Sequence, residues 1–354
     1  MRIKVFLTAA ALALTAVPAT AASPTSIGLS NYQVSGIFAL DILNGTGGGI
    51  SGLEASAVAY ARDRVDPNTG KLGTLLFVGD EGTGVVEISR TGQTIGNNFF
   101  NWAGTGSTKH DTEGLTYLGG GVLVVGEERL QDAYRFNYAA GGTVTLANSF
   151  VSISNAAVGN NGMEGISYDP RGAGSFVTIK QQTPQDILAG TLTFAAPTGS
   201  PPSLSGDGSS PPGGGVSTMT NLFNPALMGL LTLSDVQTLS PVDALAGTSA
   251  SDNLLVLSLG SQKLIEVNRS GTILSFFDLS SVLPHNAIEG VTIDDKGTIF
   301  LVAEQIQDGS SLDPFVKSQL IVLSAPVPEP ETYAMMLAGL GLLGFAARRR
   351  RQAA

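Results

Sequence analysis

The 354-residue chain has no cysteine and only two histidines. Without cysteine, the chain can form no disulfide and offers no thiolate as a nucleophile or as a ligand for zinc or iron–sulfur clusters. His110 and His285 are too few for a three-histidine zinc site within one chain. Its stability must therefore come from packing, or from a hard metal ion held by oxygen ligands.

Charged residues are also scarce, at 14% of the chain against roughly 25% in typical globular domains. The 29 acidic and 19 basic residues give a net charge of −10, and no basic patch lies inside the chain. This composition excludes binding to nucleic-acid backbones, which needs clustered positive charge. The 45 glycines, the 43% hydrophobic content and the lack of any long amphipathic helix pattern predict a folded all-β protein.

The N-terminus has the order of charges and apolar residues of a secretory signal. Arg2 and Lys4 precede an apolar run from Val5 to Val17, and small residues follow at Ala19 to Ala21. We expect residues 1–22 to be a signal peptide that signal peptidase removes. An uncleaved anchor is the alternative, although the run is shorter than the ~20 residues that span a bilayer.

The C-terminus, residues 326–354, combines three features. Pro328, Glu329 and Pro330 precede an apolar stretch at 333–347, and four arginines follow at 348–351. The combination resembles the PEP-CTERM sorting signal, and a short transmembrane helix before an arginine cluster agrees with the positive-inside rule. The resemblance implies export across the inner membrane of a Gram-negative bacterium and processing by the transpeptidase exosortase. The product is then secreted or held at the cell surface, and this helix is its only expected membrane contact.

Between these signals, at 27–325, a five-residue pattern recurs. It reads Glu-Gly-Leu-Thr-Tyr at 113–117, with similar strings at 164–168 and 289–293, a weaker copy at 56–60 and a possible fifth at 243–247. Each copy precedes a turn and an apolar strand. The copies start about 50 residues apart, which is typical of propeller blades of three or four strands. The pattern predicts a five-bladed β-propeller, with a six-bladed one as the alternative.

Two segments stand outside the repeat. The longest step between copies contains a stretch rich in Pro, Ser and Gly at 195–215, which we expect to be a flexible insertion on blade three. Residues 27–43 precede the first copy, and within them 32–40 alternate loosely in polarity. They are expected to give an outer strand that closes the ring with the last blade.

Acidic residues recur at fixed places in the repeat. Glu113, Glu164 and Glu289 each open a first strand, and the following strand often ends in acid, at Asp80, Glu81, Glu128 and Glu304. In an antiparallel hairpin these two places meet, and the first strand of a blade lines the central channel. Carboxylates gathered there would repel one another unless a cation lay among them, and calcium accepts six to eight oxygen ligands. Alternatively, each glutamate accepts backbone N–H bonds from a neighbouring blade, and both roles can coexist.

The two histidines and one aromatic group have open alternatives. His110 and His285 lie just before Glu113 and Glu289, so they are candidates for a histidine pair above a calcium ion, as in paraoxonase-like propellers, or for ordinary loop residues. Trp102, Phe99 and Phe100 could form an exposed aromatic platform, but filling the core of blade one is the expected role.

The body of the chain also resembles a known family. The runs at 111–117 and 124–129, with blade one from Glu54 to Glu81 and blade five from Glu289 to Glu304, look like the SdiA-regulated family of exported propellers and the esterase-like domain of phytases. The resemblance implies a five-bladed propeller with a calcium site at the channel, held by Glu113, Glu164 and Glu289 and by Glu54, Asp80, Glu81, Glu128 and Glu304. The chain departs from the family at 180–182 and 259–260, where acids are missing.

These observations favour a monomeric, exported, calcium-binding propeller that acts as a binding module at the surface or in the extracellular matrix. Its ligand would be an extracellular polysaccharide or another surface ligand. The alternative is a calcium-dependent hydrolase of ester, lactone or phosphate-monoester bonds. Glu128, His110 and His285 are the candidate catalytic residues of that reading.

Overall fold

The computed structural model describes residues 24–40, 54–80, 82–154, 158–171, 174–182, 184–203, 206–305 and 317–325, and four positions near the C-terminus. Glu81, the predicted signal peptide and the sorting residues Pro328, Glu329 and Pro330 lie outside these ranges. Within them, no helix is long and apolar enough to cross a membrane.

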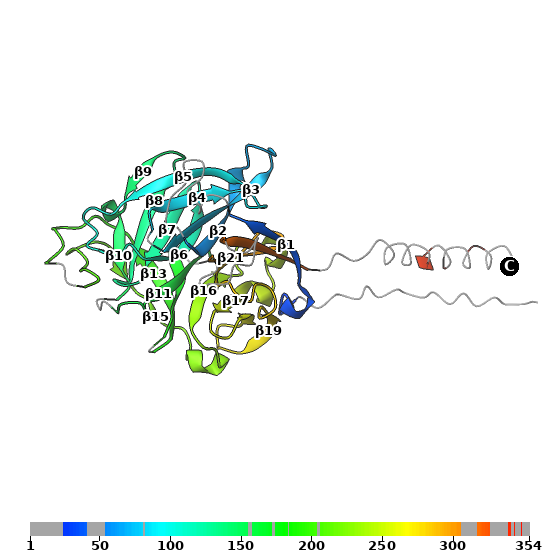
Figure 1. Cartoon of the computed structure of the whole chain (residues 1–354). Helices are drawn as coiled ribbons and strands as arrows, with labels where there is room; N and C mark the ends of the chain where they lie inside the picture. Colours follow the sequence, from blue (N-terminus) through cyan, green and yellow to red (C-terminus); the bar gives the residue numbers. More distant parts are fainter. Residues whose placement is uncertain are drawn as a thin grey trace, which may run out of the picture.

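The chain folds into five antiparallel sheets, so the predicted five-bladed propeller is confirmed and the six-bladed alternative is wrong (Figure 1). The first four blades follow one another along the chain. Their strands are β2 (Glu54–Val65), β3 (Leu72–Asp80), β4 (Gly84–Ile88) and β5 (Thr94–Asn101) in blade one; β6 (Thr112–Gly119), β7 (Val122–Glu127), β8 (Asp132–Asn137) and β10 (Phe150–Ser152) in blade two; β11 (Met163–Asp169), β12 (Ser175–Lys180) and β13 (Asp186–Thr193) with the short β14 (Val216–Ser217) and β15 (Thr220–Asn221) in blade three; and β16 (Leu233–Thr238), β17 (Leu254–Ser258), β18 (Lys263–Val267) and β19 (Ile273–Asp278) in blade four.

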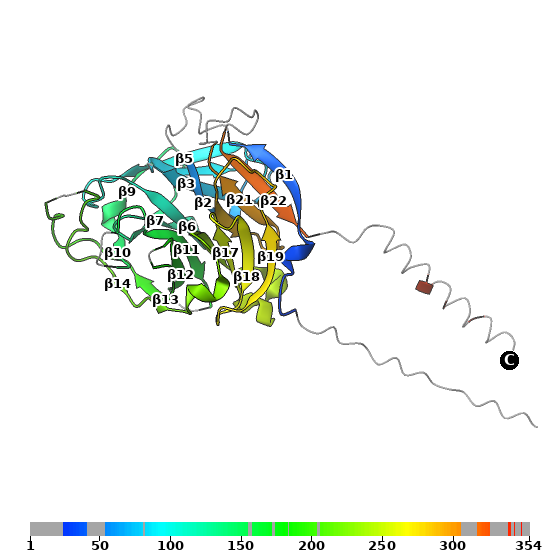
Figure 2. The ribbon, with the colours of Figure 1, turned by 60° about the horizontal axis from the view of Figure 1, so that its bottom comes forward.

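Blade five closes the ring with strands from both ends of the propeller. It consists of β20 (Ile288–Ile293), β21 (Ile299–Ala303) and β22 (Gln319–Ser324), and β1 (Gln33–Ala39) pairs with β22 as the outer strand. Figure 2 shows β1 in blue beside β22 in orange. The predicted closing strand is therefore confirmed. A further short strand, β9 (Thr143–Thr145), adds to blade one in parallel with β5.

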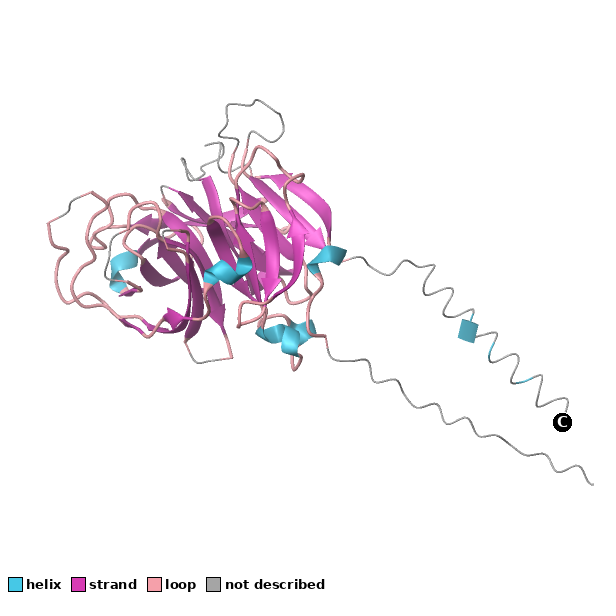
Figure 3. Cartoon of the chain, turned by 90° about the horizontal axis from the view of Figure 1, so that it is seen from below, coloured by secondary structure: helices cyan, strands magenta, loops and turns pink. Residues whose placement is uncertain are grey.

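Strands dominate the described chain, and the helical segments are single turns at its periphery (Figure 3). These turns are η1 (Leu29–Asn31), η3 (Leu146–Asn148), η4 (Pro225–Met228), η5 (Asp243–Leu245) and η6 (Ser249–Asp252). The position of η5 corrects one expectation, because the possible fifth copy at 243–247 is a helical turn. The inner strand of blade four is β16, where Ser234 and Asp235 replace the Glu-Gly of the repeat.

The five inner strands contact one another in the order β2, β6, β11, β16, β20 and back to β2. In each of them the pairing register with the next strand shifts by one residue near the start, at Ser56, Glu113, Glu164, Ser234 and Glu289. Such irregularities redirect a side chain. The glutamate of the repeat therefore takes the same irregular place in three blades, and a serine takes it in two.

The glycine after that glutamate is required by the close approach of neighbouring inner strands. A Cβ on Gly165 would lie 2.9 Å from the Cα of Asp235 in the next blade. On Gly290 it would lie 2.8 Å from the Cα of Ala57, again in the next blade. Real Cβ atoms do not approach backbone this closely, so a larger residue would force the blades apart.

The hydroxyl of the repeat joins three of the five blades to the next blade. Thr116 Oγ1 accepts from the N–H of Tyr168 at 2.9 Å, and Ser167 Oγ accepts from the N–H of Thr238 at 2.9 Å. Thr292 Oγ1 accepts from the N–H of Tyr60 at 3.1 Å. These hydroxyls satisfy buried backbone donors that face another blade and have no partner in their own sheet.

Five apolar clusters fill the five junctions between blades. Trp102 belongs to the cluster between blades one and two, where it is 9% exposed and its Nε1 donates to the carbonyl of Gly82 at 2.6 Å. Phe100 is equally buried, whereas Phe99 is 38% exposed. The core-filling role of Trp102 and Phe100 is thus confirmed. Burial of each such side chain contributes about 1.5–3 kcal/mol, and no cross-link supplements it.

The described part of the insertion at 195–215 contacts the loop that precedes blade two. Its Asp207 carbonyl accepts from the N–H of Thr108 at 3.2 Å, and its Ser209 N–H donates to Gly106 at 3.2 Å. Arg129 reaches the Asp207 carboxylate at 3.4 Å. These contacts place the insertion beside the residues that lead into β6.

Candidate metal centre

Carboxylates gather where the five inner strands begin. We call this group the acidic rim, and it consists of Glu54, Asp80, Asp111, Glu113, Glu128, Glu164, Glu289 and Glu304. Glu113, Glu164 and Glu289 take the irregular place near the start of β6, β11 and β20. Glu54 opens β2, Asp80 ends β3, Asp111 directly precedes β6, and Glu128 and Glu304 directly follow β7 and β21. Every predicted carboxylate that the structure describes belongs to this group.

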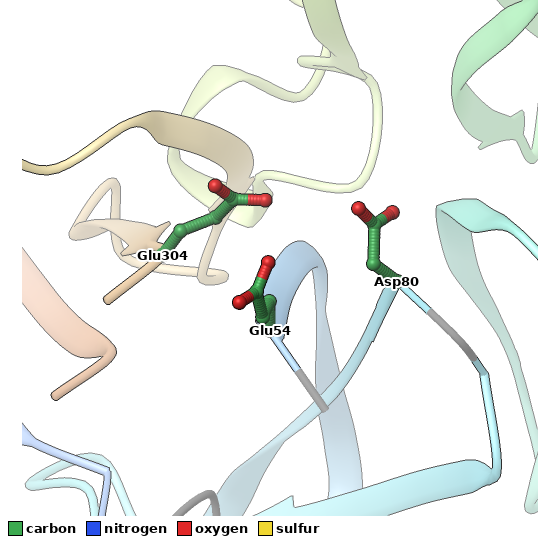
Figure 4. Close-up of side chains that lie close together, drawn as sticks. All are labelled: Glu54, Asp80 and Glu304. Carbon is green, nitrogen blue, oxygen red and sulfur yellow. The ribbon is translucent and has the colours of Figure 1, made fainter. Parts of the chain in front are cut away.

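Two sets of three carboxylates within the rim are close enough to share one ion. Glu54, Asp80 and Glu304 each offer an oxygen within 4.8 Å of the others, and so do Asp80, Asp111 and Glu113. Figure 4 shows Glu54, Asp80 and Glu304 pointing toward one another. Asp80 belongs to both sets, and its Oδ1 is buried without a hydrogen bond. A buried oxygen without a donor is a position that a cation can satisfy.

Some carboxyls of the rim have other partners than the antiparallel hairpins predict. Glu289 contacts Glu304 of its own blade, as expected. Glu128, however, hydrogen-bonds with Glu164 of the next blade, and Glu113 with Asp80 of the preceding blade. Glu113 and Glu128 therefore interact with carboxyls across blade junctions, which the hairpin spacing does not predict.

Burial and mutual repulsion raise the pKa values of the rim carboxyls. Burial raises the pKa of Asp80 to about 6 and that of Glu128 to about 8, with smaller contributions from the charge of Asp111. Burial, followed by the charge of Asp80, raises the pKa of Glu289 to about 8. Burial and then the charge of Glu289 raise the pKa of Glu304 to about 10. For the deeply buried Glu113 and Glu164, burial raises the pKa well above the usual range.

Positive charge at the rim comes from Arg129. Its Nε donates to Asp111 Oδ2 at 2.6 Å, and its other nitrogens reach Asn160 and the insertion residue Asp207. One guanidinium cannot offset eight neighbouring carboxyls, so the rim must hold protons, a cation or both. Asp111 is a rim residue that the sequence reasoning did not select, although it stands two residues before Glu113 in the same motif.

Asp235 has the alternative role expected of the acids, which is to accept backbone N–H bonds from a neighbouring blade. Asp235 is 2% exposed and accepts from the N–H of Val291 in the next blade at 2.7 Å and from the N–H of Val236 at 2.7 Å. This carboxylate joins blades four and five through backbone donors, as proposed for the glutamates. It takes the place of the repeat's glycine, one residue after the irregular position.

The two histidines occupy different environments. The imidazole of His110 lies flat on the indole of Trp102, with ring centres 4.8 Å apart and planes 9° apart. Burial there lowers the pKa of His110, and its φ of 60° is unusual for a residue with a side chain. His285 is exposed in the loop before β20. The packing of His110 on Trp102 accounts for its position, and a catalytic role of either histidine stays a prediction.

Comparison with known proteins places the chain in a family. The profile of the SdiA-regulated family matches residues 48–305, and that of the PEP-CTERM protein-sorting motif matches residues 326–351. The sorting motif implies export, surface association in a Gram-negative bacterium and processing by exosortase. No curated protein matches the chain.

Solved structures resemble the chain only distantly. Glutaminyl cyclase of Myxococcus xanthus is 12% identical, covers 84% of this chain and 97% of its own, and gives a TM-score of 0.44. A luciferin-regenerating enzyme is 13% identical, with 82% and 95% coverage and a TM-score of 0.41. Such low scores support no argument about function. With the family profile spanning most of the propeller, the chain belongs to the SdiA-regulated family.

Proposed function

We propose that this exported propeller binds calcium at its acidic rim and serves as a binding module at the cell surface or in the extracellular matrix. The observation that carries the proposal is the pair of three-carboxylate sets that share Asp80, whose Oδ1 is buried without a hydrogen bond. The sorting motif accounts for the location.

The donor chemistry favours calcium over other common metals. The rim offers carboxylate oxygens from several strands, without a cysteine and without the paired histidines that zinc or copper would prefer. Calcium accepts many oxygen ligands in flexible geometry, whereas magnesium requires a tighter octahedron. A divalent ion would also relieve the repulsion that raises the pKa values of Glu128, Glu289 and Glu304.

Calorimetric titration with calcium tests the metal site directly. The purified protein, stripped of metal with a chelator, is expected to bind calcium with a dissociation constant of about 10⁻³ M or tighter. The double variant Glu113→Gln, Glu289→Gln keeps the side-chain shapes but removes two rim carboxylates, so binding should weaken at least about tenfold. Heat of binding that is absent from the wild type, or unchanged in the double variant, would disprove the calcium site.

A calcium-dependent hydrolase is a second candidate, favoured by one observation. Burial raises the pKa of Glu128 to about 8 in the metal-free rim, so a Glu128 carboxyl that does not ligate the calcium would hold a proton near neutral pH and could donate it to a leaving group. Calcium at the rim would supply charge stabilisation for an ester, lactone or phosphate-monoester bond.

Hydrolysis of aryl esters, lactones and phytate with calcium present decides between the two candidates. An enzyme should turn over one of these substrates, and Glu128→Gln should abolish turnover while Glu87→Gln, which lies outside the rim, should not. Absence of turnover for all three classes would leave the binding module as the function.

A further inference from the structure

A cavity lies at the ends of the inner strands, on the side opposite to the acidic rim. It has a volume of about 120 Å³ and is lined by residues from β2, β6, β11, β16 and β20, so all five blades contribute to it. Its walls include the tyrosines that end three copies of the repeat, Tyr60, Tyr117 and Tyr168. The acidic rim lies at the starts of β2, β6, β11 and β20, three or more residues from the cavity along each of these strands. We call this cavity the tyrosine pocket.

The phenols of two of these tyrosines are held in place. Tyr60 Oη donates to Asp295 Oδ1 at 3.0 Å, and Tyr117 Oη donates to Asp63 while accepting from the N–H of Gly121. Burial, and then the bond to the neighbouring aspartate, raises the pKa of each phenol to about 12. The rings are therefore anchored and protonated at neutral pH. A wall that is rigid before binding loses little conformational entropy on binding.

Polar groups between the rings are also fixed. The amide of Gln237 donates to Ser167 Oγ and to the carbonyl of Thr238, and its oxygen accepts from Thr292 Oγ1 at 3.0 Å. Thr116 Oγ1 accepts from the N–H of Tyr168, which leaves its own hydrogen free to donate. The pocket thus combines aromatic surfaces with a few oriented hydrogen-bonding groups, the usual composition of a ligand site.

Charge in the pocket is balanced. Of its described lining residues, Arg62 alone is charged, and its guanidinium donates to Asp243 at 2.8 Å. Asp63 and Asp295, which lie behind the rings, each accept a phenol. An ionic ligand would meet no unpaired opposite charge here, so a neutral ligand fits better.

Size restricts the ligand further. A volume of 120 Å³ corresponds to about four water molecules at ~30 Å³ each. It lies below the ~300–1,000 Å³ of sites that enclose drug-sized molecules. The ligand must therefore be a small ring, or a terminal ring that enters while the rest of the molecule stays outside.

We propose that the tyrosine pocket binds the terminal sugar ring of a neutral glycan. A pyranose presents C–H groups on its faces, which pack on aromatic rings, and hydroxyls at its edge, which pair with fixed amide, hydroxyl and guanidinium groups. Tyr60, Tyr117 and Tyr168 supply the aromatic surfaces, while Gln237, Thr116 and Arg62 supply the polar edge. This site is separate from the calcium site, and its occupancy does not require the metal.

Saturation-transfer NMR with methyl glycosides of glucose, galactose, mannose and N-acetylglucosamine tests the proposal. The chelated full-length protein is expected to transfer saturation to at least one of them. Tyr168→Ala should weaken that binding about tenfold, whereas Tyr168→Phe, which keeps the ring, should bind within about twofold of wild type. Arg62→Ala, a change at an exposed side chain, should weaken it severalfold and serves if Tyr168→Ala does not fold.

Two results would overturn the proposal. One is no transfer to any of the four glycosides, or transfer that Tyr168→Ala and Arg62→Ala leave unchanged. The other is transfer to phenol, used as a planar aromatic probe, with none to the glycosides. Because calcium is removed throughout, neither result depends on whether the acidic rim binds metal.

Discussion

Without calcium, the protein should lose stability as the pH rises from about 5 to about 8, and saturating calcium should restore most of it. The folded state raises the pKa of Glu128 and Glu289 to about 8 and that of Glu304 to about 10, mainly through burial. Unfolded glutamates titrate near 4.3. Between these values the folded chain binds more protons than the unfolded chain, so the free energy of unfolding falls as the pH increases.

The size of this effect follows from the same shifts. One unit of pKa difference corresponds to about 1.4 kcal/mol, so a single rim carboxyl that keeps its proton from pH 5 to pH 8 lowers the free energy of unfolding by about 4 kcal/mol, and the coupled rim should lose at least that much. A change of that size moves the melting temperature of a chain of this length by about 10 °C. Under the proposed function, calcium binding to the folded rim displaces its protons, so calcium is expected to stabilise the protein more at pH 8 than at pH 5.

Thermal melts in chelator and in calcium, each at pH 5 and at pH 8, measure both the loss of stability and its recovery by calcium. Other buried acids contribute to the loss in chelator, because burial also raises the pKa of Glu127 to about 7 and of Asp132 to about 6. Those groups lie outside the rim, so the difference between the calcium and chelator curves isolates the rim itself. Equal melting temperatures at both pH values in chelator would contradict the prediction, as would a calcium effect independent of pH.

The repeat made most of the fold predictable, because three of its five positions each have a separate physical cause. The glutamate takes the irregular place in the pairing, the glycine permits the approach to the next blade, and the hydroxyl bonds the backbone of that blade. Blade four was misplaced because Ser234 and Asp235 replace Glu and Gly there. Asp235 preserves the junction through its bond to the N–H of Val291, which a search for similar letters cannot detect.

Most residues of the site could be predicted from the sequence, but the contacts between their carboxyls could not. Sequence spacing brings Glu113, Glu164 and Glu289 to the starts of inner strands. The spacing does not show which carboxyl contacts the next blade. The contact between Glu128 and Glu164 is therefore seen only in the three-dimensional structure. Asp111 was not selected because it precedes its strand, next to His110, whose φ is 60°.

Replacing a buried rim glutamate with glutamine should make the calcium-free protein more stable at pH 8, which is the reverse of the usual result for a buried polar group. Glu164 is 5% exposed and lies beside Glu128, and burial and this neighbour raise its pKa well above the usual range. Glutamine has the same shape, carries no charge and can donate to Glu128. Glu164→Gln should therefore raise the melting temperature in chelator by about 5 °C, equivalent to about 2 kcal/mol, and reduce the gain from calcium.

Glu87→Gln provides the matched control with the opposite sign. Glu87 is equally buried, at 1% exposed, but Arg64 holds it through two bonds of 2.6 and 2.8 Å and Thr74 donates a third at 2.7 Å. Removing this charge leaves Arg64 without its carboxylate, so stability should fall by about 1–3 kcal/mol while the response to calcium stays that of the wild type. If both variants lower the melting temperature alike, with calcium responses intact, Glu164 is a structural carboxyl and no metal ligand. Opposite signs, with the calcium response reduced only in Glu164→Gln, are expected because Arg64 already neutralises Glu87, whereas Glu164 lies among other carboxyls and depends on a proton or a bound cation.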